Sequence, residues 1–282
     1  MIARLAVLGL GLLGGSVAKG ARSQGLAREI VAVGRRRENM EPALRDGVVD
    51  AITTDVAEGL AGADFCVLAT PVATLASLLD VVWRVAPDDI VLTDVGSTKA
   101  AIVQTADGLA RRRPLAFIGA HPMAGSERSG YGVARADLFK GALVVLTPTD
   151  TSNPEALKRV WGFWEALGAR VTTLDPATHD RAVAAISHLP HLVADALVDA
   201  VLRMDPQFLN VAGAGFRDTT RIAAASPRVW REIFQENRAA LGEALGAFRR
   251  ALDELERLVG EGDDGLVEDA LDRIKRAREA VR

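Results

Sequence analysis

The feature that most constrains the fold of this chain is a glycine motif near its N-terminus, Gly-Leu-Gly-Leu-Leu-Gly at residues 9–14. An apolar segment of strand length, residues 4–8, leads directly into the motif, and a helical pattern runs from it to about residue 24. A strand that enters a glycine-rich turn and leaves it as a helix is typical of the first βα unit of a Rossmann-type dinucleotide-binding domain.

Each position of the motif has a physical role in that interpretation. Gly9 allows a tight turn, Gly11 lets the backbone approach a pyrophosphate, and Gly14 lets the helix pack closely on the strand. The first turn of the helix, at Leu12 and Leu13, offers unpaired N–H groups and a positive dipole end to phosphates. The alternative is a glycine-rich turn that binds nothing.

The first half of the chain alternates strand-like and helix-like segments. The strand-like segments are nearly continuous apolar runs, as expected when helices cover both faces of a sheet. This alternation favours a doubly wound parallel sheet. The expected strands are residues 4–8, 29–33, 48–53, 64–69, 89–93, 115–119, 143–146 and 171–174.

The composition changes near residue 175, after which we find no strand pattern. Three helical patterns follow, at residues 176–204, 228–259 and 266–281. We therefore expect an α/β Rossmann-type dinucleotide-binding domain at residues 1–174 and an all-α dimerisation domain at residues 175–282. Apolar residues such as Leu241 and Leu245 form a stripe along the second helix. Such a stripe usually lies in a core, but here it could instead form part of a dimer interface.

Charge and cysteine content exclude several other classes. The formal net charge of -3 gives no basic surface for nucleic acid. Cys66 is the single cysteine, so no intrachain disulfide can form, which fits a reducing, cytoplasmic compartment. The apolar residues 5–18 are interrupted by glycines and are shorter than the about 20 residues that a membrane span needs. We expect neither nucleic acid nor membrane as a partner.

The end of the second expected strand bears on the choice of cofactor. An NAD site usually has a carboxylate about 20 residues after the motif, to bind the ribose 2′-hydroxyl. Here Gly34 is followed by Arg35, Arg36 and Arg37, and guanidinium groups suit a 2′-phosphate. We predict NADP as the preferred cofactor, with NAD possible and a merely solvated arginine turn as the alternative.

Polar residues follow three more of the expected strands. Thr70 and Pro71 end the fourth strand, Ser97 follows the fifth, and His121 follows the sixth. The carboxyl ends of parallel strands share one edge of the sheet, where open α/β folds bind ligands. A histidine there can transfer a proton near neutral pH, and Ser97 could orient it.

The other three histidines lie close together in the expected helical domain. His179, His188 and His191 fall within thirteen residues, and Ser187 and His191 are four apart, a spacing that shares a helix face. Two histidines three apart could ligate a metal, but no cysteine or clear third ligand accompanies them. We expect no metal, and a solvated or core histidine pair remains an alternative.

At this point the sequence resembles the prephenate/arogenate dehydrogenases of tyrosine biosynthesis. No single motif decides the resemblance, but the combination is specific, occurs in order and spans nearly the whole chain. The matching segments are residues 9–14, Asp94-Val-Gly-Ser97, His121-Pro-Met-Ala-Gly-Ser126-Glu127, Ser187-His188-Leu-Pro-His191, Gly215-Phe-Arg-Asp218-Thr-Thr-Arg221-Ile-Ala and Trp230-Arg-Glu-Ile-Phe-Gln-Glu-Asn237.

The resemblance implies the reaction. A hydride leaves ring C4 of prephenate or arogenate for the nicotinamide, CO2 leaves from C1, and the ring becomes aromatic. It also implies that His121 binds the 4-hydroxyl and acts as the base. Ser97 would orient that hydroxyl and His121, and Arg221 would bind a substrate carboxylate. Which of the two substrates is preferred stays open.

The resemblance further implies a substrate pocket and a homodimer. Ser126, Ser187 and His191 would line the pocket, with His179 and His188 nearby. Glu127, Asp218 and Arg221 would form an ionic gate, and Trp230 would approach from the partner subunit. No regulatory or mutase domain is expected within these 282 residues.

Two other functions remain to be weighed. A related hydroxyacid or imine reductase would share the layout, but the hydroxyacid enzymes need a catalytic lysine in the helical domain, and residues 176–234 contain none. A catalytically silent NADP-binding sensor would be expected to have lost its proton-transfer residue, whereas His121 and Ser97 are present.

Overall fold

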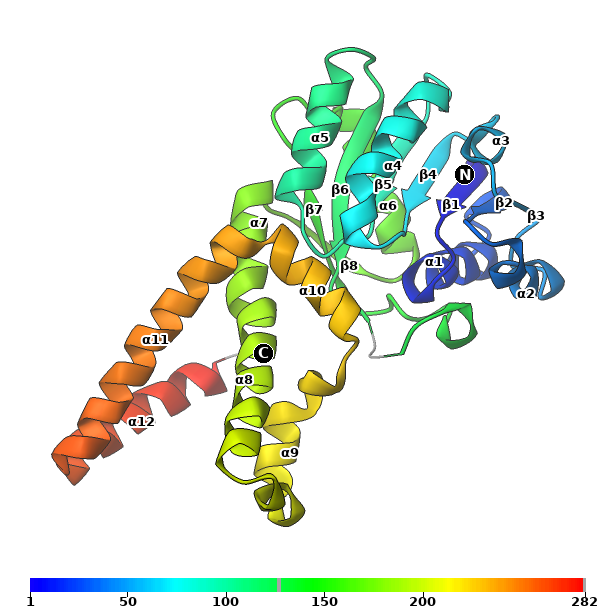
Figure 1. Ribbon diagram of the computed structural model, residues 1–282. Helices are drawn as coiled ribbons and strands as arrows, with labels where there is room; N and C mark the ends of the chain where they lie inside the picture. Colours follow the sequence, from blue (N-terminus) through cyan, green and yellow to red (C-terminus); the bar gives the residue numbers. More distant parts are fainter. Residues whose placement is uncertain (126–127, 281–282) are drawn as a thin grey trace.

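The computed structural model describes residues 1–125 and 128–280. Within them, eight strands form one sheet in the N-terminal half of the chain (Figure 1). The strands are β1 (Ile2–Leu8), β2 (Ala27–Val33), β3 (Ala51–Thr53), β4 (Phe65–Leu68), β5 (Val91–Asp94), β6 (Ala116–Pro122), β7 (Leu143–Thr147) and β8 (Arg170–Thr173). Their order is β3-β2-β1-β4-β5-β6-β7-β8, so the direction of winding reverses between β1 and β4.

The sheet departs from the expected all-parallel arrangement at one place. It is parallel from β3 to β6 and between β7 and β8, but β7 runs antiparallel to β6. Parallel neighbours are usually joined by a helical crossover. The described residues between β6 and β7 contain only one 3₁₀ turn, η2 (Tyr131–Val133). The expectation of a fully parallel sheet was therefore wrong for this edge.

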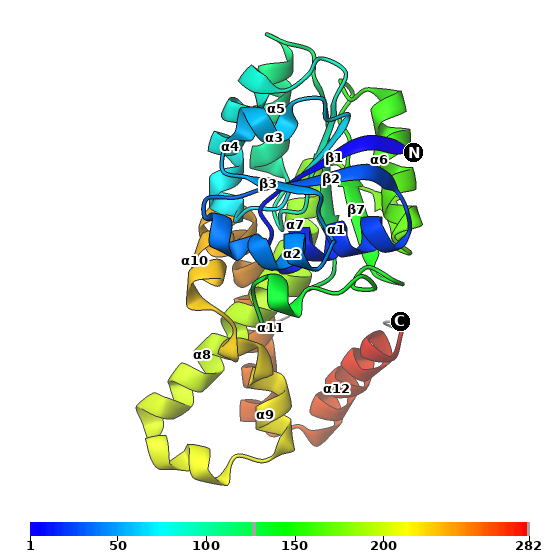
Figure 2. The ribbon, with the colours of Figure 1, turned by 90° about the vertical axis from the view of Figure 1, so that its right-hand side faces the viewer.

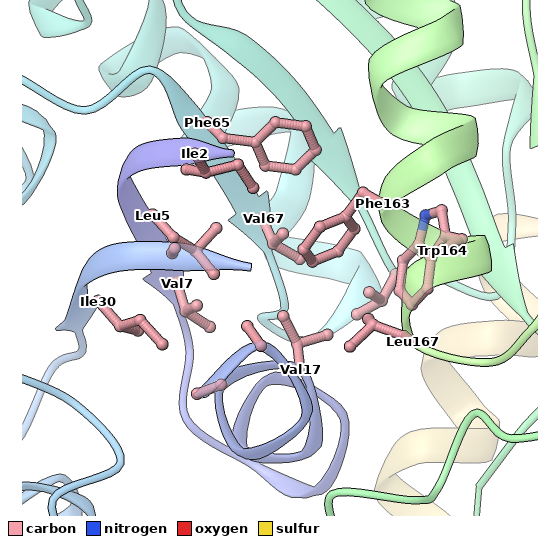
Figure 3. Packing of buried hydrophobic residues seen from close by; sticks show 14 of the residues in the cluster. Ile2, Leu5, Val7, Val17, Ile30, Phe65, Val67, Phe163, Trp164 and Leu167 are labelled. Atoms are coloured by element: carbon pink, nitrogen blue, oxygen red, sulfur yellow. The ribbon is translucent and has the colours of Figure 1, made fainter. Parts of the chain in front are cut away.

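Helices cover both faces of the sheet, which explains the apolar runs in the strands. Leu5 and Val7 of β1 pack in one cluster with Phe163 and Trp164, as Figure 3 shows, whereas Ala6 and Leu8 point into a second cluster. The helices of this half are α1 (Leu12–Ser23), α2 (Glu41–Arg45), α3 (Val56–Leu60), α4 (Val72–Val85), α5 (Ala100–Ala110) and α6 (Pro154–Ala166), with η1 (Arg37–Asn39).

The rest of the described chain is helical. Its elements are α7 (Pro176–Val183), η3 (Ala184–His188), α8 (Leu189–Met204), η4 (Pro206–Val211), α9 (Ala214–Thr220), η5 (Arg221–Ala224), α10 (Pro227–Glu236), α11 (Arg238–Glu261) and α12 (Asp264–Glu279). The single helix expected at residues 228–259 is divided at Asn237, because this residue turns its amide inward to the backbone oxygen of Asp180.

The helical half projects from the sheet as separate arms. Figures 1 and 2 show α8 and α11 starting near α7 and then diverging, with α12 folding back beside α11. The helical stretch Pro176–Met204 is long and apolar enough to cross a membrane by length and composition, and 17% of its most apolar window is buried. These two properties do not distinguish a membrane span from a helix that another subunit covers.

Candidate active site

The glycine turn has the geometry that the motif predicts. Gly9 has a φ of 97°, and a Cβ there would lie 2.7 Å from the backbone oxygen of Ala69. A Cβ on Gly14 would lie 2.0 Å from the backbone oxygen of Gly9, so helix α1 can approach the strand only with glycine here. A Cβ on Gly11 would instead enter open space, beside a helix N-terminus that no side chain caps. The turn therefore leaves room for a pyrophosphate where N–H groups can bind it.

This turn lies at the point where the strand order reverses. The N–H of Gly9 donates to the backbone oxygen of Val33 on β2, and β4 on the other side of β1 continues into Thr70 and Pro71. Pro71 is exposed and sits at the N-cap position of α4. A crevice between the carboxyl ends of diverging strands is the usual ligand site of such sheets.

The three arginines after β2 are not equivalent. The Arg37 guanidinium donates to the backbone oxygen of Ile52 over 3.1 Å, which ties it to β3. Arg35 and Arg36 are exposed, and their guanidinium groups have no hydrogen bond or ion pair with any other described residue. Gly34, just before them, donates its N–H to Thr53 on β3. Two guanidinium groups are thus available to an anion at the end of β2.

A hydrogen-bonded chain of three side chains joins the two halves of the molecule. His121 on β6 places its Nδ1 2.9 Å from Nε2 of His179 on α7, and Nδ1 of His179 lies 2.8 Å from Oδ1 of Asp180. The carboxylate also accepts the backbone N–H groups of Lys99 and Ala100, over 2.7 and 2.9 Å. His179 and Asp180 are buried, and His121 is half-buried. Asp180 therefore caps the start of α5 while it holds His179.

These contacts shift the pKa of Asp180 downward. Burial by itself would raise the pKa of the carboxyl group, but hydrogen bonds from the His179 ring and from the amides of Ala100 and Lys99 outweigh it. Asp180 is consequently an anion that can only accept hydrogen bonds at neutral pH.

The pKa of His121 is also lowered, well below its usual value of 6.5. Burial is the main cause, and positive charge on His179, Lys99 and His188 would lower the pKa further. His121 is therefore a neutral imidazole near neutral pH, with a lone pair available on one ring nitrogen.

A fully buried ion pair lies next to the hydrogen-bonded side chains of His121, His179 and Asp180. The ammonium of Lys99 contacts the carboxylate of Asp94, and both side chains have no exposed surface. Asp94 also accepts the N–H groups of Gly96 and Ala120, over 2.8 and 3.0 Å. Ala120 precedes His121 on β6, so this pair fixes the ends of β5 and β6 relative to each other.

The remaining histidines contact α10 and the start of α11. Asn237 donates to the backbone oxygen of Asp180 over 2.7 Å, and its amide nitrogen lies 3.2 Å from Nδ1 of His188. Burial lowers the pKa of His188 to about 4, although Asp180 opposes the shift. The His191 ring stacks on Trp230 with centroids 3.5 Å apart, at the wall of a cavity of about 620 Å³.

The structure thus brings His121, His179, His188, His191 and Trp230 into one neighbourhood. Other predicted site residues stand differently. Ser187, in the π-helical turn η3, is exposed, whereas His191, four residues later on α8, is buried. Ser97 is half-buried without a hydrogen bond to His121, Arg221 is exposed and does not line the cavity, and Ser126 and Glu127 lie outside the described residues.

Sequence reasoning missed Asp180, Asn237 and the role of Lys99. The one available signal for Asp180 was its position next to His179, since a carboxylate beside a histidine can orient it. Among the described residues, no group of three or more His, Cys, Asp or Glu could hold a metal ion. The histidine nitrogens at this site instead contact one another, Asp180 and Asn237.

The fold and the site define a two-domain protein of the dinucleotide-dependent dehydrogenase class. Residues 17–173 match the family model for the nucleotide-binding domain of prephenate dehydrogenase, and residues 175–272 match the model for its dimerization domain. The chain belongs to the prephenate dehydrogenase family.

Relatives extend the similarity over the whole chain. The prephenate dehydrogenase of Bacillus subtilis (strain 168) is 33% identical over 259 residues, which cover 90% of this chain and 70% of that protein. The Aquifex aeolicus prephenate dehydrogenase, solved with hydroxyphenyl propionate and NAD+, has a TM-score of 0.93 and 32% identity and covers 100% of this chain and 99% of its own. The Synechocystis arogenate dehydrogenase has a TM-score of 0.86 and 33% identity, with coverages of 98% and 99%.

Proposed function

We propose that this protein oxidatively decarboxylates prephenate, arogenate or both in tyrosine biosynthesis, with a nicotinamide dinucleotide as the hydride acceptor. The observation that carries the proposal is the position of His121. This neutral histidine is hydrogen-bonded to His179 and lies at the same edge of the sheet as the glycine turn. Its relatives include both a prephenate and an arogenate dehydrogenase, which supports the substrate class.

The residues present suit the proton transfer that this reaction needs. When bound, the dinucleotide supplies the nicotinamide ring that accepts the hydride from C4 of the substrate. His121 binds the proton of the 4-hydroxyl as the C4–H bond breaks, and returns it to the phenolate oxygen as CO2 leaves. Ser97, on the loop before α5, would orient the hydroxyl. The two halves of the chain together position the ring and exclude water.

A four-way assay tests the proposal. Purified protein is supplied with prephenate or arogenate, each with NAD or NADP, and reduced cofactor is followed by its absorbance. Turnover in at least one combination supports the proposal and identifies the preferred substrate. No turnover in any combination would remove the proposed function and favour a nucleotide-binding sensor.

Within this function we propose NADP as the preferred cofactor, because Arg35 and Arg36 are exposed and unpaired within the described chain. Changing both to alanine should raise KM for NADP by about 10- to 100-fold, since a lost charge-assisted hydrogen bond costs about 1.5–3 kcal/mol. KM for NAD should change by less than about twofold. Arg28→Ala, on the exposed part of β2, is the matched control. A wild-type protein that prefers NAD would show that the arginines are only solvated surface.

The pH profile should reflect the lowered pKa of His121. A base with a lowered pKa stays deprotonated to lower pH, so kcat/KM should keep its plateau through pH 6.5 and fall only below it. Besides burial, the neighbours that lower this pKa are His179, Lys99 and His188, while Asp180 bonds to His179 and Asp94 pairs with Lys99. An acid limb centred at or above pH 6.5 would contradict the assignment of His121 as the base.

We also propose that Arg221 binds a substrate carboxylate. Arg221→Ala should raise KM for the ring substrate by about 10- to 100-fold, again from a lost charge-assisted hydrogen bond. The KM for the cofactor should be unchanged, which serves as the internal control of the steady-state measurement. An unchanged KM for the ring substrate would mean that another group binds the carboxylate.

We further propose a cytoplasmic homodimer built on the helical half. The described chain exposes large apolar side chains along its projecting arms, including Met204, Val211 and Val259. The helical stretch Pro176–Met204 is also mostly unburied within one chain. A second copy would cover this surface, and the family model for residues 175–272 is described as a dimerization domain. Trp230, which stacks on His191 of its own chain, would then lie near the partner.

A further inference from the structure

The direction of each hydrogen bond in the chain of three side chains follows from its last member. Asp180, as an anion, can only accept, so Nδ1 of His179 must donate to it. With the single ring proton of His179 placed on Nδ1, its Nε2 can only accept, so Nδ1 of His121 donates across the 2.9 Å contact. His121 is left with a bare Nε2, which has no hydrogen-bond partner among the described residues.

We propose that His179 and Asp180 are positioning residues for His121: they hold it as the tautomer that carries its proton on Nδ1 and offers Nε2 to the substrate hydroxyl. The inference rests on the proposed function for its catalytic consequence. In this proposal His179 supports His121 and does not itself contact the substrate, because both of its ring nitrogens are bonded, to His121 and to Asp180.

Asp180 is itself fixed from three directions. Its two carboxylate oxygens accept the N–H groups of Lys99 and Ala100 at the start of α5, where the helix dipole favours an anion. Its backbone oxygen accepts the amide of Asn237 at the start of α11. The carboxylate is buried and cannot turn away from His179 without losing a bond to α5. The orientation of His121 therefore depends on elements from both halves of the chain.

The decisive variant is Asp180→Asn, which keeps the shape and reverses one hydrogen bond. With its oxygen still accepting from the N–H of Ala100, the new amide would place its NH2 group against Nδ1 of His179 and donate to it, and the bond from the N–H of Lys99 would be lost. His179 would then carry its proton on Nε2 and donate to His121, which would be forced to place its own proton on the nitrogen that faces the substrate. In a serine protease triad, the same substitution leaves the geometry intact and lowers kcat by about 10⁴-fold through the wrong tautomer.

We expect Asp180→Asn to lower kcat by about 10²- to 10³-fold, with KM for both ligands within about threefold and a melting temperature lowered only by the loss of the one hydrogen bond from Lys99. Asp88→Asn is the matched control, because this exposed carboxylate precedes β5, pairs with Arg113 and lies outside the helical half, so its loss should leave kcat as it is. A purely structural role for Asp180 would instead lower the melting temperature and change KM and kcat together. Wild-type kcat in a folded Asp180→Asn variant would overturn the proposal.

A second measurement does not depend on activity. The chain has only four histidines, so imidazole ¹⁵N chemical shifts can be assigned and report which ring nitrogen carries the proton. Above neutral pH, His121 should be protonated on Nδ1 in the wild type and on Nε2 in Asp180→Asn. If wild-type His121 carries its proton on Nε2, the inference is wrong even if the enzyme is active. If the tautomers are as expected but no substrate turns over, the proposed function fails instead.

Discussion

Replacing His121 with asparagine should lower kcat by about 10²- to 10⁴-fold, the usual contribution of a general base. The asparagine amide can still donate to Nε2 of His179, so the hydrogen-bonded chain keeps its geometry, but no lone pair remains where Nε2 of His121 was. The glycine turn lies on other strands, so the Kd of the cofactor should stay within about twofold. Steady-state kinetics and a fluorescence titration with the reduced cofactor measure the two quantities.

The outcome discriminates between roles for this histidine. A variant that keeps most of its rate would exclude His121 from the chemistry and would shift attention to His188 or His191. A variant that loses cofactor affinity together with rate would indicate that His121 supports the dinucleotide site.

Replacing Lys99 with methionine should cost about 3–5 kcal/mol of the free energy of unfolding, because it leaves the buried carboxylate of Asp94 without its counter-charge. For a chain of this size the melting temperature should fall by on the order of 10 °C. Thermal unfolding, followed by circular dichroism, measures the change.

The chain offers a matched control for this prediction. Lys158 pairs with Glu155 over 2.7 Å, but both side chains are largely exposed. Lys158→Met should therefore change stability by no more than about 1 kcal/mol. Equal effects of the two substitutions would mean that water reaches Asp94 once the lysine is removed. A double variant, Lys99→Met with Asp94→Asn, should regain part of the loss, since it removes the uncompensated charge.

Much of the fold could be predicted from local patterns. The glycine turn and the apolar strands are local in sequence, and burial on both faces of a sheet leaves a simple signature. The start of α6 is local in the same way, since Asn153 precedes Pro154 and its side chain accepts from the N–H groups of Glu155 and Ala156. The antiparallel placement of β7 and the break at Asn237 were not predictable, because both depend on contacts with distant segments.

The candidate site shows the same division. Histidines are rare in this chain, so His121, His179, His188 and His191 were conspicuous. Their partners were not, because the bond between His121 and His179 joins residues 58 positions apart. Nothing in the local sequence distinguishes Asp180 from other helical aspartates, because its contacts with Lys99 and Ala100 form only when α7 packs against the start of α5. The sequence contains the groups, and only tertiary packing determines which of them form bonds.

The bond from His121 to His179 has a consequence for how such a chain could evolve. A fragment ending at residue 174 would keep the glycine turn and His121. It would lack the His179 imidazole and the Asp180 carboxylate, which determine the ring nitrogen of His121 that carries the proton. Exchanging the helical half for that of another dehydrogenase would break the same chain of bonds. The two halves can therefore be recombined only with partners that supply the pair His179 and Asp180, and the boundary between them is a poor place for shuffling.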